Sequence, residues 1–390
     1  MKDIVIRNII SREKKRQKKQ INLIASENIV SKEVLNALGS ELVNKYSEGY
    51  PNKRYYQGNE FIDELEIETQ KRALKLFKLH YNEWSVNMQA LSGSTANLSI
   101  YAALVPIGGK IMSLDLKSGG HLSQIQPASF SGKIWQQISY SVDKETELIN
   151  YDQIEKILKK EKPEIITVGF SAYSRDIDYR KIKEICLQTN TILHVDMSHT
   201  AGIISAGYMN NPFLYADIVM TTTHKTLRGP KSALIFSKID ERKLPEKINK
   251  AVFPGIFGGP HNHQIAGVAV ALHEANTKDF KKYIHQVLKN TKAFSNEFKK
   301  LGWKIVSGGT DNHLFILKTF ESGINKTGKE ASEILKEHNI IVNMNIIPFD
   351  TLGSNKTSGV RIGTPFQTSK GWKEKDFILL AKKVDKILKN

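Results

Sequence analysis

The sequence predicts an α/β protein with a large domain built on a mostly parallel sheet and a smaller α+β domain at the C-terminal end. Three observations support this prediction. Strand-like apolar segments alternate with amphipathic helical segments through the middle of the chain. The strand-like segments are almost continuously apolar, as in parallel strands that are buried on both faces. The length, 390 residues, is more than one hydrophobic core usually organises.

The predicted sheet draws on strand-like segments spread through the middle of the chain. They are residues 84–91, 110–116, 164–171, 191–196 and 216–223. Residues 151–162 and 178–189 carry apolar side chains at helical spacing, which predicts helices that connect one parallel strand to the next. Ligands on such sheets bind at the carboxyl ends of the strands. The polar residues that follow each strand are therefore the candidates for function.

A change in composition marks the expected domain limit. A helix rich in small residues at 264–276 is followed by a long amphipathic helix at 279–302. Beyond it we expect a pair of short strands within residues 303–320 and a lysine-rich helix at the end of the chain. We predict an N-terminal arm, a large domain and a small C-terminal domain, covering residues 1–30, 31–275 and 276–390.

The composition is that of a globular protein with an unusual charge. Hydrophobic residues make up 40% and charged residues 25%, which excludes a disordered or fibrous chain. The net charge of +17 comes mostly from lysines scattered over predicted helix faces rather than gathered in a nucleic-acid-binding tract. The single cysteine, Cys186, excludes an intrachain disulfide and is expected in the core. Because we find neither a signal-peptide core nor a membrane-spanning run, we expect a cytoplasmic protein without a membrane partner.

Three strand ends carry residue types that suit one kind of cofactor. Ser92, Gly93 and Ser94 precede a helix, where N–H groups and hydroxyls can bind a phosphate, although a plain helix N-cap would use the same residues. Asp196 ends a buried strand and could meet a pyridinium nitrogen or cap the next turn. Lys225 follows another strand, where burial beside cationic groups would lower its pKa and allow attack on a carbonyl. Together they predict a phosphorylated aldehyde cofactor bound to Lys225, with its ring nitrogen kept protonated by Asp196.

Segments that contain these residues occur in the order and approximate spacing of one known family. They are "LIASEN", "NKYSEGYPNKRYY", "SGSTAN", "GGHLS", "GFSAYS", "VDMSHTAG", "TTTHKTLRGP", "AVFPGIFGGPHNH", "GGTDNHL" and "SGVRIGTP". Over most of its length the chain resembles the serine hydroxymethyltransferases, which are fold-type-I pyridoxal-phosphate enzymes. The resemblance implies that serine and glycine are interconverted. Pyridoxal 5'-phosphate would be the cofactor, and tetrahydrofolate the co-substrate that accepts the one-carbon unit.

The resemblance also implies which residues bind the cofactor. Lys225 matches the lysine that forms the Schiff base, and Asp196 matches the partner of the ring nitrogen. The other implied contacts are His121 stacked on the ring, Ser171 and His199 at the phenolic oxygen, and a phosphate cup of Ser92, Gly93 and Ser94 completed by Gly258 and Gly259 of a neighbouring subunit. The active site would therefore be shared across the interface of a homodimer.

Further residues match positions that handle the substrates. Arg361 matches the clamp on the substrate carboxylate, because a guanidinium fork can grip two oxygens at once. The substrate contacts implied by the resemblance are Ser26, Tyr46, Glu48, Tyr56 and Arg361. The implied catalytic residues are Lys225, Glu48, His224 and Tyr46. The implied folate contacts are Tyr55, Leu116, Leu122 and Asn345.

The chain departs from the family pattern at two informative places. Ser118 and Gln124 stand where the family has histidines on either side of the histidine that stacks on the cofactor. In the loop 349–355, an asparagine, a proline and an apolar residue are replaced by Phe349, Ser354 and Asn355. Losing the proline loosens this loop, and losing the apolar side chain weakens its packing on folate.

Three functions compete at this stage. A folate-dependent serine hydroxymethyltransferase is the leading prediction. A folate-independent pyridoxal-phosphate aldolase or transaldolase, acting on threonine-like β-hydroxy amino acids, would keep the same cofactor residues. A basic RNA-binding protein on a retired enzyme fold would need only the positive charge, and we do not expect nucleic acid as a partner. No metal is expected, because His261 and His263 are more typical of a surface loop than of a ligand set.

Overall fold

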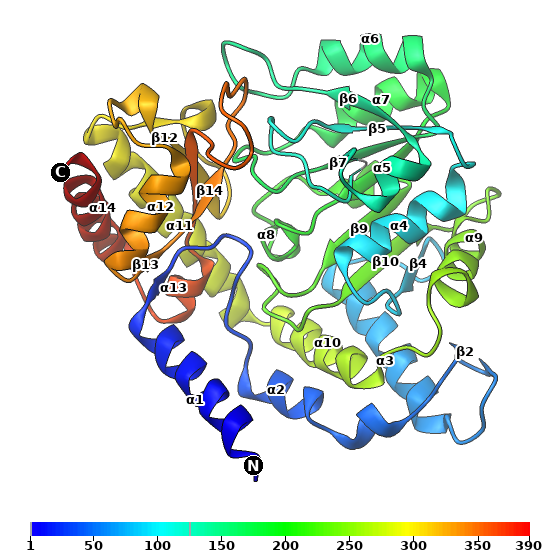
Figure 1. The fold of residues 1–390 in the computed structure, drawn as a ribbon. Coiled ribbons are helices and arrows are strands. Elements are labelled where there is room, and N and C mark those ends of the chain that lie inside the picture. Colours follow the sequence, from blue (N-terminus) through cyan, green and yellow to red (C-terminus); the bar gives the residue numbers. More distant parts are fainter. Residues whose placement is uncertain (1, 125) are drawn as a thin grey trace.

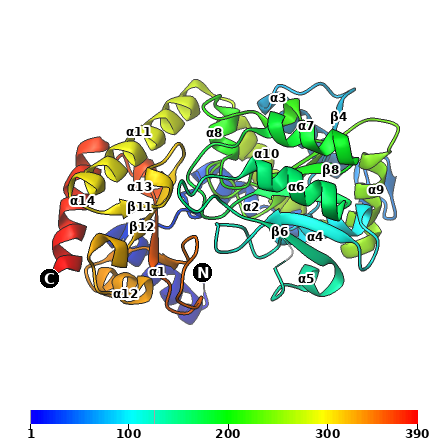
Figure 2. The ribbon, with the colours of Figure 1, turned by 90° about the horizontal axis from the view of Figure 1, so that it is seen from above.

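The computed structural model describes residues 2–124 and 126–390. Its two principal sheets have seven and four strands, and each has a hydrophobic core of its own. The long helix α11 (Lys278–Lys300) joins the two units, as Figures 1 and 2 show. Phe280 and Ile284 in its first turns pack into the core of the large sheet, while Phe294 and Phe298 in its last turns pack into the core of the small sheet.

The large sheet confirms the predicted mostly parallel α/β architecture. Its strands lie in the order β4 (Trp84–Asn87), β10 (Ala233–Lys238), β9 (Ile218–Thr222), β8 (Ile192–Asp196), β7 (Ile165–Gly169), β5 (Lys110–Leu114) and β6 (Gln136–Tyr140). Neighbouring strands run parallel except at β10, which is antiparallel to both β9 and β4. Every predicted strand is present in this sheet, and β6 and β10 are additions that the sequence analysis missed.

Helices cover both faces of the large sheet. Along β7, Ile165 packs into one apolar cluster, while Ile166 and Val168 pack into another, as expected for a strand buried on both faces. The predicted crossover helices α6 (Tyr151–Glu161) and α7 (Tyr179–Thr189) cover the second cluster. The first cluster is covered by α4 (Gly93–Leu104) and α9 (Leu244–Lys250). Cys186 of α7 is buried in the core, as predicted.

The small unit is an antiparallel sheet packed against helices. Its strands lie in the order β11 (Lys304–Ile305), β12 (Leu314–Lys318), β15 (Gly359–Gly363) and β14 (Asn343–Asn345). The first two confirm the predicted pair of short strands. Helices α12 (Gly328–Glu337) and α14 (Glu374–Lys389) share their core with α11, and α14 is the predicted lysine-rich helix.

The N-terminal segment reaches the small unit. Helix α1 (Ile4–Lys19) has no buried residue, and the following strand β1 (Ile21–Asn22) pairs in parallel with β13 (Ile340–Ile341). Further elements are α2 (Lys32–Leu38), β2 (Gly49–Tyr50), β3 (Lys53–Arg54), α3 (Glu60–Leu76), α8 (Ala201–Ser205), α10 (Asn262–Ala275) and α13 (Pro365–Ser369). The predicted limits of the arm and the two domains stay predictions. Within residues 2–124 and 126–390, no helix combines the length and apolar character needed to cross a membrane.

Candidate active site

A cavity of about 350 Å³ lies where β7, β8 and β9 end, as expected for ligand sites on parallel sheets. The predicted site residues that line it are Ser26, Ser92, Gly93, Ser94, His121, Ser171, Asp196, His199, His224, Lys225 and Arg361. Four further lining residues were not predicted from the sequence: Ser123, Phe170, Ser198 and Thr222. Most of the predicted cofactor contacts thus meet in one place, although they come from segments far apart in the chain.

The first wall of the cavity is the N-terminal end of α4. Ser92 is the N-cap of this helix, and its side chain forms a reciprocal capping box with Thr95. The first-turn N–H groups at Gly93 and Ser94 border the cavity, so the N-cap and the predicted anion cup are the same structure. A Cβ on Gly93 would lie 2.6 Å from Cγ2 of Thr222, and glycine is therefore required where the helix meets β9.

Asp196 at the end of β8 is a buried, ionised carboxylate. Burial raises the pKa of Asp196, but the positive charge of Lys225 and hydrogen bonding by the Ser198 side chain lower it, and the net effect is a lowered pKa. The Ser198 N–H donates to Oδ1 at 3.1 Å. A buried anion with a lowered pKa at this point can stabilise a cationic ring nitrogen.

Lys225 follows β9 and is only 8% exposed. Burial lowers the pKa of Lys225 to about 8, opposed by Asp196 and assisted by the charge of Arg361. About a tenth of the amine is therefore uncharged at pH 7 and available to attack a carbonyl, far more than for an exposed lysine. Burial also lowers the pKa of the adjacent His224 to about 4, so its imidazole is neutral.

Neutral histidines form another wall. His121 accepts or donates a hydrogen bond between Nδ1 and the Ser123 hydroxyl at 2.7 Å, and burial lowers its pKa. His199 Nδ1 lies 3.2 Å from His313 Nε2, and the two rings stack with centroids 5.3 Å apart. Burial holds the pKa of His199 well below its usual value and lowers that of His313 to about 3. His313 was missed as a site residue, although it lies within the quoted segment "GGTDNHL".

Arg361 brings the small unit into the site. It lies on β15, where its Nε donates to Oδ1 of Asn343 at 3.1 Å and its Nη1 donates to the carbonyl oxygen of Ser171 at 2.7 Å. Burial lowers the pKa of Arg361 to about 10, so the side chain stays charged at neutral pH. Within the described residues Nη2 makes no hydrogen bond, which leaves one arm of the fork for an anionic ligand.

A second group of predicted site residues does not line this cavity. Tyr46 donates to Oε1 of Glu48 at 3.3 Å, and its ring packs edge-on against Tyr56 with centroids 5.3 Å apart. Gly258 and Gly259 pack against the same tyrosine so closely that a Cβ on Gly259 would lie 3.0 Å from its ring. Tyr46 is 54% exposed. We call these five residues the Tyr46 cluster, and the structure of one chain keeps it apart from the lining of the Lys225 cavity.

The predicted folate contacts are dispersed. Leu116 lines a separate cavity of about 730 Å³ together with residues 349 and 351–354 of the altered loop. Leu122 is exposed, Asn345 lies on β14, and Tyr55 packs edge-on against Phe253. The structure thus brings Leu116 and the altered loop together and leaves the other three outside that cavity.

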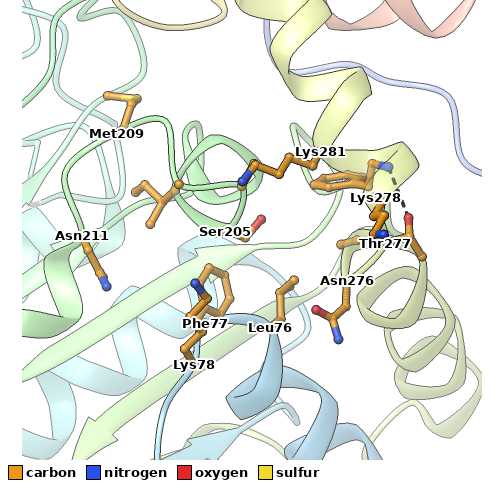
Figure 3. Close-up of a pocket in the computed structure, with 15 residues that line it drawn as sticks. Leu76, Phe77, Lys78, Ser205, Met209, Asn211, Asn276, Thr277, Lys278 and Lys281 are labelled. Atoms are coloured by element: carbon orange, nitrogen blue, oxygen red, sulfur yellow. Dashed lines mark hydrogen bonds between the residues drawn. The ribbon is translucent and has the colours of Figure 1, made fainter.

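Another cavity, of about 380 Å³, holds none of the predicted residues. Figure 3 shows Leu76, Phe77 and Lys78 at the end of α3 on one side of it, and Lys278 and Lys281 of α11 on the other. It combines an apolar floor with a lysine rim and lacks the carboxylate and imidazole groups of the Lys225 cavity.

The Lys225 cavity fits pyridoxal phosphate. It offers an amine with a lowered pKa, an ionised carboxylate and a helix N-terminus for a phosphate. Its walls also hold buried polar atoms, Thr222 Oγ1 and His224 Nδ1, that lack a hydrogen-bond partner among the described residues. The fold and this site define a fold-type-I pyridoxal-phosphate enzyme.

Comparison with known proteins identifies the family. A family profile described as serine hydroxymethyltransferase matches residues 1–384. Curated relatives of that name from Phytoplasma australiense and Mycoplasma mobile are both 48% identical over 100% of this chain, and the alignments cover 93% and 91% of the relatives. A serine hydroxymethyltransferase from Caenorhabditis briggsae is 46% identical over 95% of this chain and 75% of its own length. The chain belongs to the serine hydroxymethyltransferase family, which confirms the resemblance found in the sequence.

Proposed function

We propose that this chain interconverts serine and glycine, with pyridoxal phosphate as cofactor and tetrahydrofolate as the carrier of the one-carbon unit. The observation that carries the proposal is the buried pair of Lys225 and ionised Asp196 in one cavity with Arg361. The full-length match to serine hydroxymethyltransferases supports the same activity. It does not favour the folate-independent aldolase or the RNA-binding protein.

The walls of the cavity supply separate functions toward the cofactor. Pyridoxal phosphate, when bound, supplies an electron sink for the electron pair released at the α-carbon of the substrate. Lys225 Nζ would hold its aldehyde carbon, and Asp196 would keep its ring nitrogen protonated. The first-turn N–H groups of α4 would bind the phosphate. His121 would lie against the ring, and Ser171 and His199 would contact the phenolic oxygen.

Arg361 and its neighbours would orient the amino-acid substrate. Two donors of the guanidinium are fixed by Asn343 and Ser171, so the remaining arm is pre-oriented toward the cavity. A carboxylate bound there would place the α-carbon near Lys225, in the cavity that Ser26 also lines. His224, neutral because burial lowers its pKa to about 4, can accept a hydrogen bond from the substrate.

We further propose that two copies of the chain share each active site. The support is the Tyr46 cluster, which holds Glu48, Gly258 and Gly259 outside the Lys225 cavity, next to the exposed Tyr46. A carboxylate that handles protons needs to approach the substrate within hydrogen-bond distance. A second copy that docks its Tyr46 cluster over the cavity of the first would provide that approach and complete the phosphate cup.

Two finer proposals concern the folate and the compartment. The cavity between Leu116 and the altered loop is large enough for part of tetrahydrofolate, and it supports folate binding at the junction of the two units. We also propose that the protein works in the cytoplasm. The single, buried cysteine is consistent with a reducing compartment.

Serine cleavage measured with and without tetrahydrofolate tests the proposed function. We expect the purified holoenzyme to release glycine from serine at a rate that depends on added tetrahydrofolate, with threonine cleaved in its absence only as a slow companion reaction. Cleavage of serine or threonine at the same rate with and without tetrahydrofolate would contradict the proposal and support a folate-independent aldolase.

A further inference from the structure

Two carboxamide side chains hold Asp196, and neither was assigned to the site from the sequence. Asn97 of α4 donates from Nδ2 to Oδ2 of Asp196 at 3.1 Å. Gln124, in the turn that follows β5, donates from Nε2 to the same oxygen at 3.2 Å. Both side chains are buried. These contacts pair both amide nitrogens, whereas Oδ1 of Asn97 has no hydrogen-bond partner among the described residues.

The same two side chains also contact the segment that carries His121. Gln124 accepts the backbone N–H of His121 at its Oε1 with a distance of 3.3 Å, which orients Nε2 toward Asp196. Asn97 Nδ2 also donates to the Ser123 hydroxyl at 2.9 Å, and that hydroxyl bonds Nδ1 of His121 at 2.7 Å. Each carboxamide therefore spans from the carboxylate to the segment that carries the stacking histidine.

The contacts leave one acceptor position of Asp196 open. An ionised carboxylate accepts at about four lone-pair positions. Asn97 and Gln124 occupy two of them at Oδ2, and the N–H of Ser198 occupies a third at Oδ1. Donors to a carboxylate favour its charged form. The remaining position is the one available to a donor inside the cavity.

Resting on the proposed function, we propose that Asn97 and Gln124 are positioning residues that keep Asp196 ionised and aligned with the ring nitrogen of the cofactor. They also fix the distance between that carboxylate and His121. One hydrogen-bond network would thus position both the group at the nitrogen of the cofactor ring and the histidine that stacks on its face. Gln124 stands where the family has a histidine, and its place in this network explains what the glutamine does there. Its amide accepts from the backbone at one end and donates to Asp196 at the other.

Gln124→Glu tests the proposal with a substitution of the same shape. It replaces the Nε2 donor with a carboxyl group, and the two carboxyl groups in contact share one proton, so the negative charge of Asp196 at the ring nitrogen falls. We expect the holoenzyme, loaded with ring-¹⁵N-labelled pyridoxal phosphate, to show the ring-nitrogen NMR signal shifted toward unprotonated pyridine. The dissociation constant for pyridoxal phosphate should rise about tenfold or more. Gln124→Leu, which removes the donor without adding charge, should shift both readouts in the same direction by less.

Gln89→Glu is the matched control. Gln89 donates from Nε2 to the buried carboxylate of Glu66 at 3.0 and 3.2 Å, outside the Lys225 cavity. This variant should lose stability but leave the ring-nitrogen signal unchanged. If Gln124→Glu and Gln124→Leu both bind the cofactor within about twofold of the parent, with unchanged ring-nitrogen signals, the proposed role is overturned. A parent enzyme that binds no pyridoxal phosphate would instead overturn the proposed function.

Discussion

The Lys225 cavity and the Tyr46 cluster contain residues predicted for one active site, yet within one chain the two groups lie apart. In the cavity, Lys225 and Asp196 are each 8% exposed, and their charges act on one another. In the cluster, Tyr46 is 54% exposed and the neighbouring Tyr55 74%. The difference teaches that cofactor chemistry is built into the core of one chain. The residues proposed to handle protons at the substrate lie in a more exposed cluster, and they would reach the cavity only if a second copy docks there, as proposed.

The largest expected effect comes from removing the amine in the cavity. Lys225→Ala should lower multiple-turnover serine cleavage by about 10³-fold or more, because alanine has no amine that can bind the aldehyde of the cofactor. The visible absorbance of the purified protein should also lose the band of covalently bound cofactor. Lys238→Ala, which removes an exposed lysine at the end of β10, is the control and should leave both readouts unchanged. A yellow, fully active Lys225→Ala enzyme would exclude the assigned role.

The second prediction concerns Glu48 of the Tyr46 cluster and its replacement by a second copy of the chain. Glu48→Gln should lower the turnover number about 10²-fold, as is typical for loss of a general acid or base. If sites are shared, coexpression of Glu48→Gln with Lys225→Ala should recover activity. Half of the dimers would then be mixed, with one intact site of two, so about a quarter of the parental activity should return.

The controls for that experiment use the same pair of substitutions. The double variant Glu48→Gln/Lys225→Ala, coexpressed with the parent, should leave the mixed dimers with no intact site, so about a quarter of all sites should be active; about half would be active if Glu48 and Lys225 acted within one chain. Coexpressed single variants that stay as inactive as each alone would show that Glu48 and Lys225 act within one chain. That result would contradict the proposed sharing of sites.

The sequence predicted the Lys225 cavity well because its residues obey local rules. Strands of near-continuous apolar residues indicate a parallel sheet. In such a sheet the residues that follow each strand lie at the same edge. Asp196 and Lys225 were therefore placed together from strand ends alone. The family resemblance then assigned roles to residues such as Arg361, which no periodicity would have connected to the large sheet.

The sequence could not predict contacts that depend on packing between distant segments. His313 lies on a loop before β12 of the small unit and reaches His199 only because the two units meet. Asn97 sits in the first turns of α4 and reads as an ordinary helix residue, yet it donates to Asp196. The antiparallel strand β10 was missed because periodicity alone does not distinguish a short apolar run from a buried helical segment.

The third prediction distinguishes the effect of Arg361 on binding of the substrate carboxylate from its effect on cofactor binding. Arg361→Lys keeps the positive charge but loses the fork that Asn343 and Ser171 orient. We expect the KM for serine to rise about 10- to 100-fold, with the dissociation constant for pyridoxal phosphate changed by less than about threefold. Steady-state kinetics and fluorescence titration of the cofactor measure the two effects. Equal losses in both would show that Arg361 supports the whole cavity rather than the substrate carboxylate.

The smallest expected effect is a pH dependence that only the buried amine of the cavity can produce. Burial lowers the pKa of Lys225 to about 8, and its attack on the cofactor aldehyde needs the uncharged form. The rate of covalent cofactor capture by the apoenzyme should therefore rise about tenfold per pH unit below pH 8 and level off above it. Stopped-flow absorbance measures this rate. Pyridoxine phosphate lacks the aldehyde, so its binding should not show the same inflection. A capture rate that keeps rising to about pH 10 would mean that Lys225 has the pKa of an exposed lysine. The proposed difference between the buried cavity and the exposed Tyr46 cluster would then be wrong.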